Sequence, residues 1–82
     1  MVKVAYDDKF VKQIKKIKDQ KLKKKVKKQI KKIIENPEIG KSMRFIRWGT
    51  REVYVKPFRL SYIYLKNEDK IVFLDFYHRD EQ

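Results

Sequence analysis

Between positions 9 and 36 the apolar residues recur every three or four positions, which is the spacing of one face of an α-helix. They form two series, Phe10, Ile14 and Ile17, followed by Leu22, Val26, Ile30, Ile33 and Ile34. Asp7 or Asp8 can cap the first helix, and Asp19 separates the two series and can cap the second. Pro37 disfavours a helical conformation in the residue before it and ends the second helix. The pattern predicts a hairpin of two amphipathic helices.

The rest of the chain alternates between apolar and polar residues, which is the pattern of a β-strand with one buried face. Such runs occupy residues 2–6, 51–56, 58–66 and 71–77, and residues 41–48 are expected to form a strand followed by an irregular link. Gly49 permits a tight turn, Pro57 suits the turn between two strands, and residues 67–69 suit a polar hairpin loop. The last three runs are therefore expected to form an antiparallel meander.

The period of two sorts the residues of this meander into two faces. The apolar face, expected to pack against the helices, comprises Val53, Val55, Leu60, Tyr62, Tyr64, Val72, Leu74 and Phe76. The opposite face is polar and comprises Glu52, Tyr54, Lys56, Arg59, Ser61, Asp75, Tyr77 and Arg79. The predicted fold class is α+β, with one domain over residues 1–82. Its N-terminal strand and two-helix hairpin are expected to pack on one face of a curved, mainly antiparallel sheet.

Composition limits the chemistry that this chain can perform. Its 82 residues include no cysteine and a single histidine. A thiolate zinc site, a multi-histidine metal site and a disulfide framework are therefore excluded, and we expect no metal and no cofactor. No stretch approaches the roughly 18 to 20 apolar residues needed to cross a bilayer, and the N-terminus lacks the long apolar run of a signal peptide. We expect a cytoplasmic protein with no membrane partner.

Charge narrows the choice of partners. Lysines and arginines number 23 against 11 aspartates and glutamates, which gives a formal net charge of +12. Such a field attracts polyanions, and nucleic acid, an acidic protein or an anionic membrane would all respond to it. Most lysines between positions 9 and 32 occupy angles of the two helices outside the apolar stripes. They form either a solvated face or a cationic flank directed at RNA or a ribosome.

The polar face of the meander carries groups suited to phosphate chemistry without a metal. Arginine binds phosphate oxygens in a bidentate fork and can stabilise the charge that develops in a phosphoryl transition state. Tyrosines and Trp48 can stack on unpaired bases. Asp75 is either a partner that orients Arg59 or Arg79, or a reactive carboxylate. The face is a candidate RNA cleft, and its composition fits RNA binding and RNA cleavage equally.

Three segments resemble the RelE/ParE toxin superfamily, and RelE in particular. They are Glu-Asn-Pro at 35–37, which ends the Lys-rich hairpin, Pro-Phe-Arg-Leu-Ser-Tyr at 57–62 and Phe-Tyr-His-Arg-Asp at 76–80. The resemblance spans almost the whole chain and implies a RelE-like fold and a toxin of a type II toxin–antitoxin system. The activity it implies is that of a ribosome-dependent endoribonuclease, which cleaves mRNA in the A site. In that reaction the ribose 2′-hydroxyl attacks the adjacent phosphate and leaves a cyclic phosphate.

The resemblance also implies partners and site residues. The implied partners are the ribosome with its mRNA and an acidic RelB-like antitoxin, with a toxin–antitoxin heterotetramer as the expected assembly. Arg59 matches the strand arginine that contacts the scissile phosphate in this family, and Arg79 matches the arginine after the last strand. The expected catalytic set is Arg59, Arg79, Tyr54 and Lys56. The expected RNA-binding set is Arg44, Arg47, Arg51, Ser61, Tyr77 and His78.

The strand before the turn departs from the family pattern. The family commonly has basic residues at two alternating positions that here are Glu52 and Tyr54, while Lys56 supplies a positive charge one pleat further along. Some family members use a tyrosine beyond the final arginine. Here either Tyr54 or Tyr77 takes that role, or the tail has been lost, or the protein is catalytically weak. His78 is either a general acid or base or a structural residue. The alternative function is a non-catalytic ParE-like toxin that inhibits DNA gyrase, or a degenerate antitoxin-binding module.

Overall fold

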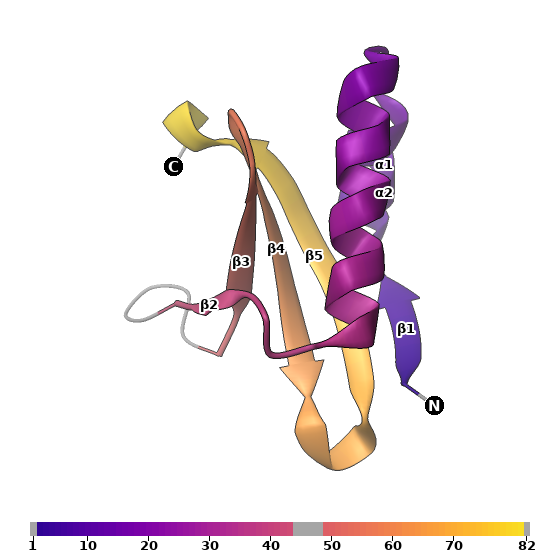
Figure 1. The fold of residues 1–82 in the computed structure, drawn as a ribbon, viewed down its shortest axis with the longest axis vertical. Helices are drawn as coiled ribbons and strands as arrows, with labels where there is room; N and C mark the ends of the chain where they lie inside the picture. The colour runs from indigo at the N-terminus through magenta and orange to yellow at the C-terminus, as the bar shows by residue number, and fades with distance from the viewer. Residues whose placement is uncertain (1, 44–48, 82) are drawn as a thin grey trace.

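The computed structural model describes residues 2–43 and 49–81. Its elements are β1 (Lys3–Tyr6), α1 (Asp8–Lys15), α2 (Gln20–Glu35), β2 (Lys41–Ser42), β3 (Arg51–Val55), β4 (Phe58–Leu65) and β5 (Lys70–His78). Short 3₁₀ turns follow β4 and β5, at Lys66–Glu68 and Arg79–Glu81. The described strands form one open sheet in the order β1-β5-β4-β3-β2 (Figure 1), with β1 parallel to β5 and the other neighbours antiparallel. The predicted α+β fold class and order of elements are confirmed.

The two predicted caps start the helices. The side chain of Asp7 accepts a hydrogen bond from the backbone N–H of Lys9 (3.0 Å), and that of Asp19 accepts one from Lys21 (2.9 Å). Helix α2 ends at Glu35, where the sequence predicted its end. No helix in the described part of the chain is long and apolar enough to cross a membrane.

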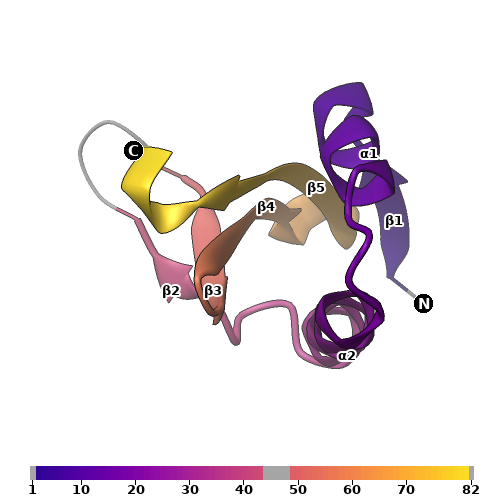
Figure 2. The same ribbon diagram turned by 90° about the horizontal axis from the view of Figure 1, so that it is seen from above.

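The core lies between the helices and one face of the sheet. Figure 2 shows α2 end-on beside the curved sheet, with α1 next to β5. The buried apolar side chains are Phe10, Ile17, Val26 and Ile33 from the helical half, and Val55, Leu60, Tyr62, Ile71, Phe73 and Phe76 from the sheet. The ring of Phe73 stacks on those of Phe10 and Tyr6, with 5.4 Å between centroids in each pair. Each fully buried side chain of this size contributes about 1.5–3 kcal/mol, so this cluster holds the helices on the sheet.

A bulge in β5 changes the expected arrangement of the core. The pairing of β4 with β5 skips Leu74, which makes it the extra residue of a β-bulge. An extra residue reverses the alternation of side chains beyond it. The prediction that Val72 and Leu74 face the helices is therefore wrong, and Ile71 and Phe73 are fully buried there instead. Phe76, on the other side of the bulge, lies in the core as predicted.

The connection from α2 to β2 is fixed by Tyr62 and Arg51. The Tyr62 hydroxyl accepts a hydrogen bond from the N–H of Gly40 (2.9 Å) and donates one to the carbonyl of Pro37 (2.8 Å). Burial raises the pKa of Tyr62 above its ordinary value. Nη1 of Arg51 donates to the carbonyls of Glu38 (3.1 Å) and Gly40 (2.9 Å). A Cβ atom on Gly40 would lie 2.6 Å from the Tyr62 hydroxyl, so this close approach requires glycine.

β2 lies at the start of residues 41–48, where a strand followed by an irregular link was expected. It comprises only Lys41–Ser42, which pair with Glu52 and Arg51 of β3. Residues 44–48 lie outside the described residues, and Arg44 and Arg47 of the expected RNA-binding set are among them.

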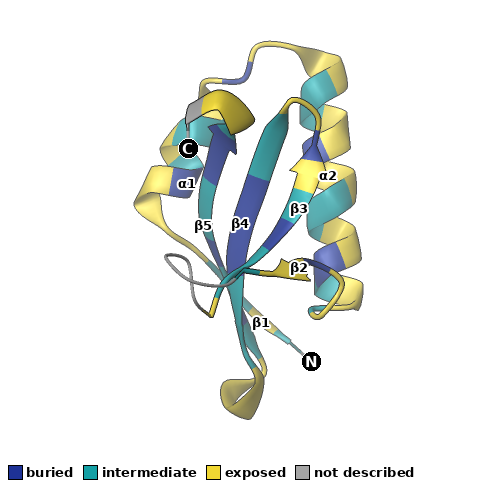
Figure 3. Cartoon of the chain, turned by 90° about the vertical axis from the view of Figure 1, so that its left-hand side faces the viewer, coloured by how far each residue is buried: buried dark blue, intermediate teal, exposed yellow. Residues whose placement is uncertain are grey.

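The outer side of α2 concentrates positive charge. Eight of its 16 residues are lysines, and its one acidic residue is Glu35 at the C-terminal end (Figure 3 shows how much of the helix is exposed). Among the described residues, no carboxylate forms an ion pair with a lysine of α2. Lysines four residues apart face one another in five pairs: Lys21–Lys25, Lys23–Lys27, Lys24–Lys28, Lys27–Lys31 and Lys28–Lys32. Each such pair destabilises a helix by about 0.2–0.5 kcal/mol, so α2 is less stable than a helix of mixed charge.

Replacing Lys28 by glutamate is expected to stabilise the protein. Lys28 lies three or four residues from Lys24, Lys25, Lys31 and Lys32, so Lys28→Glu converts four repulsive neighbours into attractive ones. We expect the free energy of unfolding to rise by about 1 kcal/mol at low salt. The gain should shrink at high salt, because salt screens exposed charges. Urea unfolding followed by circular dichroism at two salt concentrations measures both effects.

Lys66→Glu is the matched control for this prediction. The Lys66 ammonium lies 3.6 Å from the Glu38 carboxylate on the surface, so the same change of charge removes an attraction instead of a repulsion. It should not stabilise the protein. Unchanged or lower stability of Lys28→Glu at low salt would contradict the account of repulsion along α2.

Candidate phosphate-binding site

Two rows of side chains run across β3, β4 and β5 on the face of the sheet that points away from the core. One row consists of Tyr54, Arg59 and Tyr77, and the next consists of Glu52, Ser61 and Asp75. The register is set by the two-residue turn Lys56–Pro57, across which Val55 pairs with Phe58. The faces predicted for β3 and β4 are therefore confirmed.

Glu52 places an almost completely buried carboxylate in this face, with only 5% of the residue exposed. Its Oε2 accepts a hydrogen bond from the hydroxyl of Tyr77 (2.5 Å), and its Oε1 lies 3.8 Å from Nη1 of Arg59. Burying a charge is costly unless the charge is paired and hydrogen-bonded, and these two contacts meet both conditions. The Arg59 guanidinium is thereby tied to a fixed point of the sheet.

Arg59 lies between this carboxylate and the exposed ring of Tyr54. Its guanidinium carbon is 5.2 Å from the centre of the Tyr54 ring, which is within the range of cation–π attraction. One fifth of the side chain is exposed (20%), and its buried Nε has no hydrogen-bond partner among the described residues. A guanidinium held in this way presents donors in a fixed direction and suits an anion with several acceptor oxygens, such as phosphate.

A hollow at the end of the β3–β4 hairpin collects the expected catalytic residues. It has a volume of about 330 Å³ and is lined by Tyr54, Lys56, Pro57, Phe58, Arg59 and Arg79. Arg79 comes from the 3₁₀ turn after β5, and 69% of its side chain is exposed beside the carboxylate of Asp80 (3.8 Å). An ion pair this exposed contributes little, so Arg79 remains available to a ligand. The structure brings three cations and one tyrosine of the expected catalytic set to one place.

The described residues of the expected RNA-binding set do not line this hollow: they are Arg51, Ser61, Tyr77 and His78. Arg51 lies on the helix side of β3, where its guanidinium donates to two backbone carbonyls of the α2–β2 connection. Ser61 is 2% exposed and Tyr77 is 5% exposed, and the hydroxyl of Tyr77 is directed at Glu52. In the isolated chain Ser61 and Tyr77 present little surface to a ligand, and Arg51 stabilises the α2–β2 connection instead.

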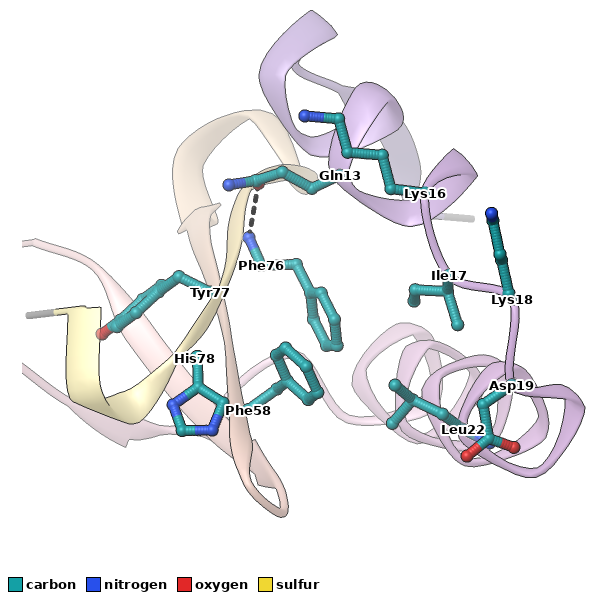
Figure 4. A pocket seen from close by; sticks show the side chains of 10 residues that line it. All are labelled: Gln13, Lys16, Ile17, Lys18, Asp19, Leu22, Phe58, Phe76, Tyr77 and His78. Carbon is teal, nitrogen blue, oxygen red and sulfur yellow. Dashed lines mark hydrogen bonds between the residues drawn. The ribbon is translucent and has the colours of Figure 1, made fainter.

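His78 belongs to a second hollow, on the helix side of the sheet. Figure 4 shows its ring beside that of Phe58, and the two centroids are 5.4 Å apart in an edge-to-face arrangement. Nδ1 of His78 accepts a hydrogen bond from the N–H of Asp80 (3.1 Å). This second hollow, of about 440 Å³, also includes Lys16 and Lys18 from the α1–α2 link. The contacts of His78 fit the structural interpretation of this residue.

The partner of Arg59 is Glu52 and not Asp75, the carboxylate that the sequence suggested. Oδ2 of Asp75 instead lies 3.4 Å from the ammonium of Lys9 in α1. The signal for Glu52 was present in the sequence, because the turn Lys56–Pro57 fixes a register that places it diagonally across from Arg59, within reach of a long side chain. Alternation alone shows that Glu52 and Asp75 share a face with Arg59. Counting the residue pairs of β3 and β4 back from the turn shows in addition that Glu52 lies next to Arg59.

Comparisons with known proteins identify a family and a fold for this chain. A family model described as "ParE toxin of type II toxin-antitoxin system, parDE" matches residues 4–82. The isolated RelE toxin of E. coli superposes with a TM-score of 0.80 at 15% identity, over 95% of this chain and 84% of that chain. The toxin–antitoxin complex RelBE2 of Mycobacterium tuberculosis contains a chain that matches with a TM-score of 0.80 at 22% identity, over 95% and 98%. YafQ of E. coli strain BL21(DE3) gives 0.73 at 21% identity, over 99% and 97%. At these identities the likeness to solved structures establishes the fold alone, and no curated protein matches the chain.

The pairing of Glu52 with Arg59 is expected to appear as an energetic coupling. Arg59→Met removes the guanidinium that pairs with the buried Glu52 carboxylate, and we expect it to lower the free energy of unfolding by about 2 kcal/mol. In a Glu52→Gln background the same substitution should cost much less. The difference, measured by urea unfolding of the four proteins, should give a coupling energy of about 1–2 kcal/mol.

The same cycle on Lys66 and Glu38 is the control, because this pair has a similar separation of 3.6 Å but is exposed. Its coupling energy should fall below about 0.5 kcal/mol. A coupling between Glu52 and Arg59 no larger than that of the control would mean that Glu52 does not hold Arg59 in place.

Proposed function

The chain belongs to the ParE family of toxins of type II toxin–antitoxin systems, and we propose that it acts as a ribosome-dependent endoribonuclease that cleaves mRNA in the A site. Its fold is that of the RelE and YafQ toxins. The observation that supports cleavage is the gathering of Tyr54, Lys56, Arg59 and Arg79 around one hollow. Three cations around a space of this size suit a single phosphodiester group.

The proposed reaction is an internal transfer at phosphorus. The 2′-oxygen of a ribose forms a bond to the adjacent phosphorus while the bond from phosphorus to the 5′-oxygen breaks. The products are a 2′,3′-cyclic phosphate and a free 5′-hydroxyl. The attacking 2′-hydroxyl loses a proton and the leaving 5′-oxygen gains one. We assign these two proton transfers to Tyr54 and Lys56. Among the residues that line the hollow, these two have side chains that can act as a general acid or base, because arginine does not lose its proton in proteins.

Arg59 has the central electrostatic role in this proposal. Negative charge grows on the non-bridging oxygens of the phosphate as the reaction proceeds, and a donor already aimed at that charge stabilises it without rearranging. Glu52 and the ring of Tyr54 hold the guanidinium in such a position. Arg79, which also lines the hollow and is largely exposed, completes a clamp on the phosphate when RNA enters.

Two macromolecular partners accompany this function. The ribosome presents the mRNA to the hollow, which places the site of action in the cytoplasm. The second partner is an acidic RelB-like antitoxin, since the RelBE2 structure with the same fold is a toxin–antitoxin complex and an acidic chain complements a net charge of +12. The assembly proposed for the neutralised state is a toxin–antitoxin heterotetramer.

One observation favours a second candidate function, inhibition of DNA gyrase without RNA cleavage. The matching family model is named for ParE toxins, and this family also includes gyrase inhibitors. In addition, Glu52 brings a negative charge within 3.8 Å of Arg59, which offsets part of its attraction for phosphate. A supercoiling assay run on the same preparation separates the two functions.

Arg59→Ala and Arg79→Ala are each expected to lower kcat for mRNA cleavage on programmed ribosomes by about 10²–10³, because each removes a donor that stabilises the transition state. Arg59→Lys should retain part of the activity, since it keeps the charge and loses the fork. Cleavage is measured by mapping RNA ends after incubation with ribosomes stalled on a defined codon. Circular dichroism checks that each variant remains folded.

Lys66→Ala is the matched control, because it removes one exposed cation away from the hollow and should leave cleavage unchanged. Full cleavage by the Arg59→Ala/Arg79→Ala double variant would sink the assignment of the site. Inhibition of supercoiling by a protein that cuts no mRNA would reverse the order of the two candidate functions.

A further inference from the structure

The lysines on the outer side of α2 take no part in the core or in the hollow. Val26 and Ile33 of this helix face the sheet and are buried. On the other side, four exposed lysines form a ridge along the helix, here called the lysine ridge: Lys21, Lys24, Lys28 and Lys31. At 1.5 Å per residue the ridge is about 15 Å long. Lys25, Lys27 and Lys32 flank it and are also exposed.

The stability of the fold does not explain the lysine ridge. Helix α2 carries eight lysines less one glutamate, a net of +7 within the total of +12. Glutamates at some of these positions would cover the same surface and form attractive pairs with the remaining lysines. Within the part of the chain that the structure describes, no ion pair offsets the repulsion. The ridge therefore suits a polyanion outside the protein.

The lysine ridge and the hollow point in different directions. Helix α2 packs against one face of the sheet, whereas Tyr54 and Arg59 lie on the other face. Figure 2 shows α2 and the C-terminal turn that carries Arg79 on opposite sides of the sheet. An RNA strand bound in the hollow therefore lies on the other side of the sheet from the lysine ridge. The ridge is left to bind a second anionic surface.

The chemistry of the ridge favours RNA over a protein or a membrane. Cores of protein interfaces are depleted in lysine and depend on apolar or aromatic anchors, and the ridge presents none. A helix that lies on a membrane inserts its apolar face, but the apolar face of α2 is buried against the sheet. Phosphate backbones, in contrast, are bound by lysines acting as point charges, without regard to base sequence.

We propose that the lysine ridge of α2 binds the phosphate backbone of a folded RNA, which in a ribosome is ribosomal RNA. This inference rests on the proposed function, because a ribosome-dependent toxin has to contact the mRNA in its hollow and the ribosome elsewhere. The protein is then held between two RNA surfaces. The ridge supplies affinity without sequence preference, and the hollow supplies the chemistry.

Salt-dependent binding tests the ridge directly. The probe is a fluorescent RNA duplex of about 20 base pairs, and anisotropy measures its affinity between about 50 and 200 mM KCl. Every protein carries Arg79→Ala, so that cleavage does not intervene. The test protein adds Lys24→Gln, Lys28→Gln and Lys31→Gln. The matched control adds Lys3→Gln, Lys41→Gln and Lys66→Gln, which removes the same charge from exposed positions outside α2.

We expect the test protein to lose about tenfold or more in affinity at low salt. Each lysine that neutralises a phosphate adds about one to the slope of log K against log salt, so its slope should fall by about 2 to 3. The matched control should lose less than about threefold. Lys28→Glu adds a second readout, because this variant should fold more stably and yet bind RNA more weakly. Loss of binding by a more stable protein cannot come from unfolding.

Equal weakening of the test protein and the matched control would assign binding to net charge and overturn the proposal. RNA affinity unchanged in the test protein, with lost affinity for an acidic antitoxin, would assign the ridge to a protein partner and also overturn it.

On programmed ribosomes, the three ridge substitutions alone should raise KM and leave kcat unchanged, whereas substitutions in the hollow lower kcat. If the unaltered protein cleaves no mRNA but the duplex results hold, the proposed function fails and the ridge stands as an RNA-binding surface.

Discussion

The buried carboxylate of Glu52 is the constraint on which the polar face of the sheet depends. A charge in this position is stable only with partners, and the sheet supplies the hydroxyl of Tyr77 at 2.5 Å and the guanidinium of Arg59 at 3.8 Å. Ser61, directly opposite on β4, has a small side chain that leaves room for these contacts. Arg59 is therefore held in position in the isolated chain, as the proposed electrostatic catalysis requires. The same carboxylate reduces the net positive charge of the site. Glu52 therefore fixes the position of Arg59 but weakens the attraction of the site for phosphate.

Repulsion among the lysines of α2 lowers the stability of the protein, and burial of the apolar cluster between the helices and the sheet offsets it. Stacking of Phe73 on Phe10 and Tyr6 joins β5 to α1 and β1. The hydroxyl of Tyr62 fixes the chain after α2 through Pro37 and Gly40. With the scaffold held in this way, two surfaces on opposite sides of the sheet can carry charges that a fold selected for stability alone would not keep.

The parts of the structure that follow from local rules could be predicted from the sequence. Aspartate caps and helical periodicity predicted both helices. Alternation and the turn at Lys56–Pro57 predicted the meander and put Tyr54, Lys56, Arg59 and Arg79 on one face, whereas their choice as a catalytic set came from the family resemblance. The core face of β5 could not be predicted, because the bulge at Leu74 reverses the alternation and the residues around it show no composition that marks a bulge. The contacts of Arg51 could not be predicted from the sequence either, for a different reason. Its carbonyl partners belong to the α2–β2 connection, so the contact depends on tertiary packing that a strand pattern does not report.

The central claim is that a phosphate held in the hollow is attacked by the neighbouring ribose 2′-hydroxyl. The most direct measurement uses ribosomes programmed with two mRNAs that differ by one 2′-deoxy nucleotide at the mapped cleavage position. The account predicts that the all-ribose mRNA yields an upstream fragment ending in a cyclic phosphate and a downstream fragment with a free 5′-hydroxyl. It also predicts that the deoxy substitution abolishes cleavage at that bond. Equal cleavage of both mRNAs, or a downstream fragment that carries a 5′-phosphate, would contradict it.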